Sequence, residues 1–147
     1  MIVTYEPADG TAEQVSTDDL SAIESASIEE AVGASWREVE DRLRAQDPTA
    51  MRAVLWAVRK RDQADLVFST FDVPGWRRRL KVRIERPEID DVLDNILAEA
   101  LAASEDAAID AMLPHLRKLA HDRADVDAAL AALGKGHLVK APAVSED

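Results

Sequence analysis

The fold is decided by residues 35–61, which read SWREVEDRLRAQDPTAMRAVLWAVRKR and contain two of the three tryptophans. Ser35 and Glu38 form an S-x-x-E capping box, in which each side chain can bond a free backbone N–H at the start of a helix. The apolar residues Trp36, Val39 and Leu43 recur at i, i+3 and i+7. This spacing predicts a helix that begins after Ser35 and ends before Asp47.

A second helix is predicted to begin at Pro48. Asp47 is a favourable N-cap, and Pro48 suits the first helical position because its missing N–H would be unpaired there anyway. The apolar stripe of this helix consists of Met51, Val54, Leu55 and Val58. Three cations at residues 59–61 end the helix, where positive charge complements the carbonyl end of the helix dipole. We prefer this explanation of the basic cluster to nucleic-acid binding.

Trp56 lies off this stripe, so its role is open. It could make a second core contact, serve as a cation–π partner of Arg52 or Lys60, or be an exposed anchor for a partner. A core position is the preferred interpretation, because tryptophan is highly buried on average.

The N-terminal segment predicts a β-hairpin. Ile2–Tyr5 is β-branched and aromatic, residues 7–10 supply turn chemistry, and residues 11–15 can return as a second strand. Because an isolated hairpin is marginally stable in water, this one is expected to pack on the rest of the chain.

An acidic helix is predicted to follow the hairpin. Ser16 or Thr17 can cap it. Leu20 and Ile23 begin its apolar stripe. Ser27 then interrupts that stripe, which drifts to Ala26, Ile28, Ala31 and Val32. The helix is therefore expected to be weakly amphipathic.

The segment after the second helix predicts a lid and a basic strand. Phe68 and Phe71 lie in the connection and are expected to fold back onto the helices. Apolar and basic residues alternate strictly from Leu80 to Ile84, which is the period of a half-buried strand. We expect a strand near residues 79–85 that has a cationic outer face and could pair with the hairpin.

The C-terminal part of the chain predicts further helices. The first begins at Pro87, and its apolar stripe consists of Ile89, Val92, Leu93, Ile96, Leu97 and Leu101. Residues 104–106 indicate a break and a new cap, Pro114 is expected to kink or restart the next helix, and Gly134 to close the last one.

Together these patterns predict a mainly α fold. It has a small N-terminal β-hairpin, one basic strand near residues 79–85 and a bundle of about five to six helices. We expect an N-terminal hairpin and three-helix unit with the basic strand over residues 1–86, a C-terminal helical region over residues 87–134, and a flexible tail over residues 135–147.

The formal charge of −11 is unevenly distributed. Residues 1–36 carry eight acids and no base, residues 37–86 have a net charge of +5, and residues 87–147 have a net charge of −8. We favour attraction between segments of one fold as the explanation. The alternative is a basic face for an acidic partner.

No catalytic or metal-binding pattern is found in the sequence. The chain has no cysteine, and its histidines, His115, His121 and His137, lack metal-ligand spacing. We therefore expect no enzyme, no cofactor and no metal. No apolar run reaches the roughly 18 residues of a membrane-spanning helix, and the N-terminus lacks the features of a signal peptide, so we expect an intracellular protein.

Three pieces of the chain carry a family resemblance. They are STDDLSAIESASIEEAVGASWREVEDRL at residues 16–43, AMRAVLWAVRKR at residues 50–61 and LVFSTFDV at residues 66–73. This block resembles the tail assembly chaperones of long-tailed phages (siphoviruses), especially those of actinobacterial hosts. It covers somewhat over a third of the chain and does not extend to residues 77–147.

The resemblance implies a role without catalysis. Such proteins bind the tape measure protein in the host cell cytoplasm, keep its apolar helices soluble and assist assembly of the tail tube. They are generally absent from the mature virion. Many occur as a short form and a longer frameshifted form, so the chain itself or that longer form is a further expected partner, whereas a membrane is not.

The two best apolar stripes are the hypothetical partner-binding sites. Their residues are Met51, Leu55, Trp56 and Val58 in the second helix of the opening stretch, and Leu93, Ile96 and Leu97 in the helix after Pro87. Each of these residues could instead be ordinary core. Two other functions are considered: a nucleic-acid-binding or regulatory phage protein that uses the basic residues 77–86, and a structural component of the virion.

Overall fold

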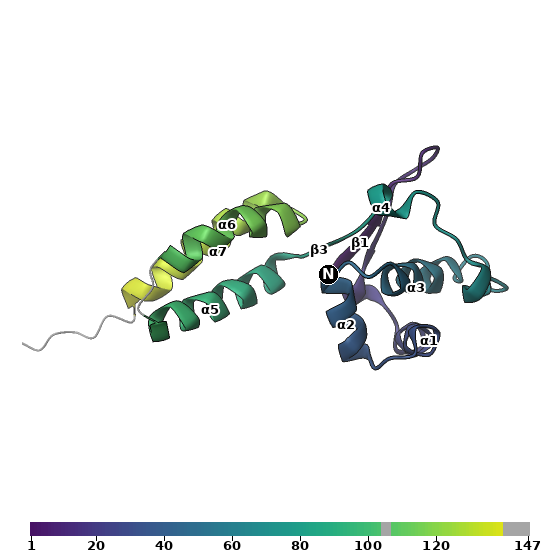
Figure 1. Cartoon of the computed structure of the whole chain (residues 1–147), viewed down its shortest axis with the longest axis horizontal. Coiled ribbons are helices and arrows are strands. Elements are labelled where there is room, and N and C mark those ends of the chain that lie inside the picture. Colours follow the sequence, from purple (N-terminus) through teal and green to yellow (C-terminus); the bar gives the residue numbers. More distant parts are fainter. Residues whose placement is uncertain (104–106, 140–147) are drawn as a thin grey trace, which may run out of the picture. The chain divides into compact units, whose positions relative to one another are not determined.

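The computed structural model describes residues 1–103 and 107–139, and it is mainly helical with a small antiparallel sheet, as predicted (Figure 1). The chain divides into two compact units, Met1–Arg83 and a second that begins at Ile84. The described residues form seven α-helices and three strands.

The sheet of the first unit contains β1 (Ile2–Tyr5), β2 (Glu13–Ser16) and β3 (Leu80–Arg83) in the order β2-β1-β3. Both neighbours of β1 are antiparallel to it. The hairpin was predicted from local signals, and the basic strand pairs with it as expected. In β3, Leu80 and Val82 are buried, whereas Lys81 and Arg83 lie on the half-exposed side.

Helices α1 (Ala22–Val32) and α2 (Trp36–Arg44) both begin with complete capping boxes. The predicted box of Ser35 and Glu38 is present at α2. The cap of α1 was predicted wrongly. Ser16 instead caps a 3-10 turn, η1 (Thr17–Asp19), and Ser21 caps α1, because Ser21 and Glu24 supply the second S-x-x-E spacing.

Helix α3 (Pro48–Arg59) is the centre of the first unit. It packs against α1, α2 and all three strands (Figure 1). It is buried on more than its predicted stripe, since the small residues Ala50, Ala53 and Ala57 are also enclosed. Asp47 caps it as predicted, accepting a hydrogen bond from the N–H of Ala50 at 3.0 Å.

The connection after α3 covers the core. It contains the 3-10 turn η2 (Phe68–Thr70) and leads to the short helix α4 (Trp76–Arg79). Phe71 and Val73 are buried, and the ring of Phe68 lies 5.3 Å from that of Trp56. Phe68 and Phe71 therefore fold back onto α3 as expected.

The second unit contains α5 (Arg86–Ala103), α6 (Ala107–Leu119) and α7 (Arg123–Val139). Its core consists of Ile89, Leu93, Leu116, Ala120, Val126 and Ala129. Pro114 lies within α6, so the helix does not restart there, and α7 continues past Gly134, which we expected to end it. The predicted break at residues 104–106 and residues 140–147 of the predicted tail fall outside the described part of the chain.

Candidate partner-binding surfaces

The predicted partner-binding residues of α3 lie mainly in the core of the first unit. Met51 and Leu55 have exposed fractions of 1% and 0%, and Trp56 has 8%. Val58 is half-buried. A partner could reach Met51 or Leu55 only if the core opened, so their role as contacts stays a prediction.

Trp56 combines two of the roles that were left open. Its Nε1–H donates to the backbone oxygen of Leu66 at 3.1 Å, and the Nζ atom of Lys60 lies 4.7 Å from its ring centroid. Arg52, the other candidate cation, stacks on Phe68 instead, at 4.0 Å. Trp56 is thus a core residue that also holds the connection after α3.

The predicted residues of α5 are more accessible than those of α3. Leu93 is buried, but Ile96 and Leu97 are half-buried. One turn beyond Leu97 on the same helix face, Leu101 is 63% exposed. The two predicted sets belong to different units, and the accessible one is in the second.

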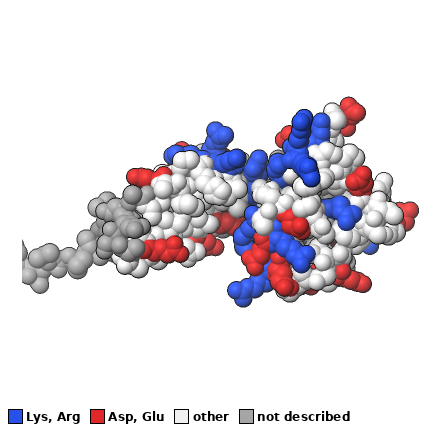
Figure 2. Space-filling model, in the orientation of Figure 1, with Lys and Arg blue, Asp and Glu red and all other residues white. Residues whose placement is uncertain are grey.

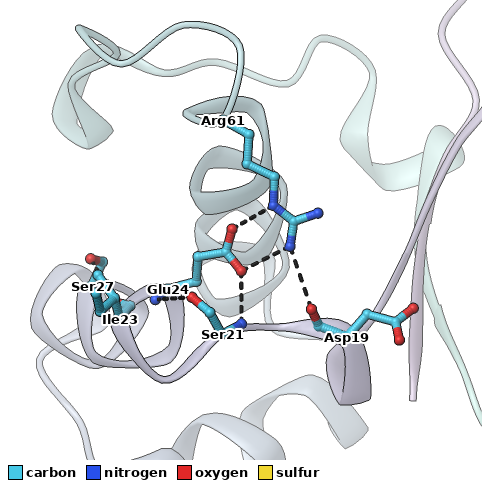
Figure 3. A network of polar contacts seen from close by, with 6 residues as sticks. All are labelled: Asp19, Ser21, Ile23, Glu24, Ser27 and Arg61. Carbon is cyan, nitrogen blue, oxygen red and sulfur yellow. Dashed lines mark hydrogen bonds and ion pairs between the residues drawn. The ribbon is translucent and has the colours of Figure 1, made fainter.

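Two of the three bases at the end of α3, Arg59 and Arg61, are paired with carboxylates within the fold. Arg59 forms two hydrogen bonds with the carboxylate of Glu13, at 2.6 and 3.1 Å. Arg61 forms two with Glu24, at 2.5 and 2.8 Å (Figure 3). Acids of residues 1–36 thus neutralise bases of the middle segment, which confirms the favoured explanation of the charge distribution for these pairs.

Arg61 also sets the ionisation of Glu24. Its hydrogen bonds to the carboxylate outweigh partial burial and, together with the Ser21 N–H, hold the pKa of Glu24 at about 2. Beside this pair, Ile23 and Ser27 are drawn on the same helix (Figure 3). They border a shallow cavity between α1 and the end of α3.

A second basic group has no carboxylate partner among the contacts of the described residues. We call Arg77, Arg78, Arg79 and Lys81 the α4–β3 cationic surface, which lies where Lys and Arg gather near α4 in Figure 2. Arg79 donates to the backbone oxygen of Glu6 at 3.1 Å, and Lys81 donates to that of Arg77 at 2.7 Å. These bonds hold the side chains of Arg79 and Lys81 in place, but a backbone oxygen does not neutralise their charge.

A cavity of about 330 Å³ adjoins this surface. Its lining consists of Pro48, Thr49, Arg52, Ser69, Thr70, Phe71, Asp72, Val73, Trp76 and Leu80. Trp76 and Leu80 belong to α4 and β3, so the cavity and the cationic surface share a border. The cavity therefore places a lining of mixed apolar and polar residues next to positive charge.

The sequence reasoning missed two features of these surfaces. Ile23 was placed in an apolar stripe but is 80% exposed. The signal was present in Ser27, which lies one turn later on the same face and shows that this face is not core. Arg52 was considered only as a cation–π partner of Trp56, and no local pattern indicates that it binds a distant loop.

The described residues contain no group of three or more His, Asp or Glu side chains arranged to hold a metal ion. Among the described helices, none combines the length and apolar composition that crossing a membrane requires.

Comparison with known proteins yields no relative. No protein-family model matches the chain, and neither the curated proteins nor the solved structures contain a significant match to it.

Proposed function

We propose that this chain is a tail assembly chaperone of a long-tailed phage, which binds the tape measure protein in the host cytoplasm and assists tail tube assembly without catalysis. One observation carries the proposal. The three pieces that resemble such chaperones form α1, α2, α3 and the covering turn η2, which pack together in one unit.

The client surface is proposed to lie on α5. An amphipathic client helix binds through an apolar groove or face. Leu97 is half-buried and Leu101 is 63% exposed one turn later, so both are accessible to such a helix. Ile96, also half-buried, extends this face. The buried Leu93 would support these residues from the core rather than touch the client.

The net charge suits a protein that holds an aggregation-prone client. A charge of −11 on 147 residues keeps complexes apart by mutual repulsion. The proposed client is the apolar helical part of the tape measure protein. In the complex, the charge that keeps complexes apart comes from this chain and not from the client.

The test is co-expression with the tape measure protein of the same genome, followed by affinity capture of the tagged chain. We expect the client to co-purify. Leu101→Ser should weaken its recovery several-fold, whereas the matched control Ala102→Ser, at an exposed neighbouring position on α5, should not. A tape measure protein that is soluble alone and never captured would refute the proposal.

Analysis of purified phage particles separates a structural role from a chaperone role. A chaperone is present in the infected cell but absent from purified particles. If particles retain the chain in a fixed ratio to the tail proteins, it is a component of the virion instead.

A further inference from the structure

We propose that the α4–β3 cationic surface and its adjoining cavity form a docking site for an acidic segment of a partner polypeptide that carries one apolar side chain. The site lies in the first unit and is separate from the α5 face assigned to the client. It therefore does not depend on the proposed function.

Arg77 and Arg78 carry positive charge that no carboxylate of the described residues compensates. In the first unit, Arg44, Arg59 and Arg61 each pair with a carboxylate. By contrast, Arg77 and Arg78 are exposed, and neither has a carboxylate partner within the part of the chain that the structure describes. A set of adjacent like charges raises the local electrostatic potential and favours an oppositely charged partner.

A cavity lies beside these charges. The buried Phe71, Val73 and Leu80 and the half-buried Trp76 belong to the apolar part of its lining. Polar side chains line it as well, namely Thr49, Arg52, Ser69, Thr70 and Asp72. Its volume of about 330 Å³ is at the lower end of the range for ligand pockets. A site of this size suits one apolar side chain better than a large cofactor.

Hydrogen bonds hold the cavity in shape before any partner binds. The guanidinium of Arg52 donates to the backbone oxygens of Phe68 at 2.8 Å and Phe71 at 2.6 Å. The hydroxyl of Tyr5 donates to the oxygen of Pro74 at 3.1 Å. These bonds fix both ends of the loop that borders the cavity, so binding has less loop ordering to overcome.

Gly75 places the cationic helix against this loop. Its φ of +69° lies in the left-handed region, where glycine is favoured. A Cβ atom at this position would approach Cδ of Arg79 to 3.0 Å. The glycine therefore lets the Arg79 side chain fold inward to Glu6, while Arg77 and Arg78 stay exposed.

The lining favours an acidic polypeptide over a nucleic acid. Asp72 lies on the cavity wall and would repel any anion that enters it, so the acids of the partner are placed outside the cavity, at Arg77 and Arg78, and its apolar side chain inside. Within residues 76–81, Trp76 is the one aromatic residue, and the guanidinium of Arg77 already lies 5.4 Å from its ring centroid. A nucleic-acid groove instead combines a basic track with several rings for base stacking.

The experiment measures fluorescence anisotropy of a labelled synthetic peptide in which Glu and Asp residues flank a single Phe, with the full chain as receptor. We expect saturable binding that weakens as salt is raised, since exposed charges are screened. The double variant R77E/R78E should weaken binding at least roughly tenfold. The charge-matched control R37E/R42E, on the exposed side of α2, should leave it within about twofold.

Two further probes complete the design. A peptide with Ser in place of Phe should bind several-fold more weakly, because the cavity is then empty. A labelled single-stranded oligonucleotide should bind more weakly than the acidic peptide. The proposal is overturned if the acidic peptide fails to bind at low salt, if both double variants weaken it equally, or if the oligonucleotide binds more tightly.

Discussion

The side-chain amide of Gln46 bonds both backbone groups of Val82, which lies 36 residues later in the chain. Its Oε1 accepts from the N–H of Val82 at 2.9 Å, and its Nε2 donates to the C=O at 3.0 Å. Val82 is in β3, the edge strand of the described sheet. The amide therefore acts like a neighbouring strand and joins the α2–α3 turn to the sheet.

This relationship predicts a stability loss for Gln46→Ala. Two part-buried backbone groups of Val82 would lose their partners, which typically costs about 1–3 kcal/mol. Urea denaturation would measure the change. Gln14→Ala, at an exposed position of β2, is the control and should be nearly neutral.

Gln46→Gly distinguishes the loss of the amide hydrogen bonds from the effect of backbone conformation at this position. Gln46 has a φ of +60°, a conformation that glycine adopts more easily. The glycine variant should therefore be less destabilised than Gln46→Ala. Equal stability of the wild type and both variants would show that the Gln46–Val82 bonds contribute nothing.

The Glu24–Arg61 pair predicts a pH-dependent contribution to stability. A carboxyl whose pKa is lowered on folding stabilises the fold above its ordinary pKa of 4.5, and this contribution is lost as the pH falls through about 2. Glu24→Gln keeps the S-x-x-E/Q capping box and removes only the charge. Because the pair is partly exposed, we expect a loss of roughly 0.2–1 kcal/mol at neutral pH.

The measurement is the free energy of unfolding of wild type and Glu24→Gln at several pH values. Their difference should shrink as the pH is lowered from 4.5 to about 2. Glu30→Gln, an exposed position of the same helix, should show no such trend. A difference between wild type and Glu24→Gln that stays constant with pH would contradict the pair's role.

Two isoleucines of α1 make a matched test of its packing. Ile28 is fully buried, whereas Ile23 is 80% exposed. Ile28→Ala should cost about 2–5 kcal/mol, because it leaves a cavity in the core. Ile23→Ala should change stability by less than about 0.5 kcal/mol. Similar thermal unfolding of the two variants would show that α1 is oriented differently.

Arg52 is expected to keep the connection after α3 well ordered. Arg52→Ala removes the donor to the oxygens of Phe68 and Phe71 and the cation stacked on the Phe68 ring. The connection should then be cut faster by thermolysin, which cleaves beside apolar residues. Arg37→Ala, at an exposed position of α2, should be cut at the wild-type rate. Unchanged cleavage in Arg52→Ala would contradict this role.

The structural features that were predicted correctly from the sequence are those with local signals. The capping box of Ser35 and Glu38, the cap at Asp47 and the alternation from Leu80 all involve residues a few positions apart, so their pattern is visible in the chain itself. The hairpin followed for the same reason. Its pairing with the basic strand joins distant residues, and it was suggested by the opposite charges of the two segments. Residues 104–106 and 140–147 do not enter this comparison.

The structural features that could not be predicted from the sequence depend on residues far apart in the chain. Gln46 and Arg52 bind loops and strands 16 or more residues away, and no periodicity encodes those bonds. The start of the α1 stripe was wrong, because Ile23 and Ser27 give conflicting signals for one helix face and Ile23 is exposed. Ile28, to which the stripe was predicted to drift, is buried. The cavity beside Trp76 arises only when α3, η2 and β3 meet, so it has no signature in any one segment.

The most direct test of the central claim is the soluble fraction of the tape measure protein from the same genome, measured by sedimentation after expression with and without this chain. The chaperone proposal predicts that the client is mainly in the pellet alone and mainly in the supernatant when the chain is present. A client whose soluble fraction is the same in both conditions would contradict it.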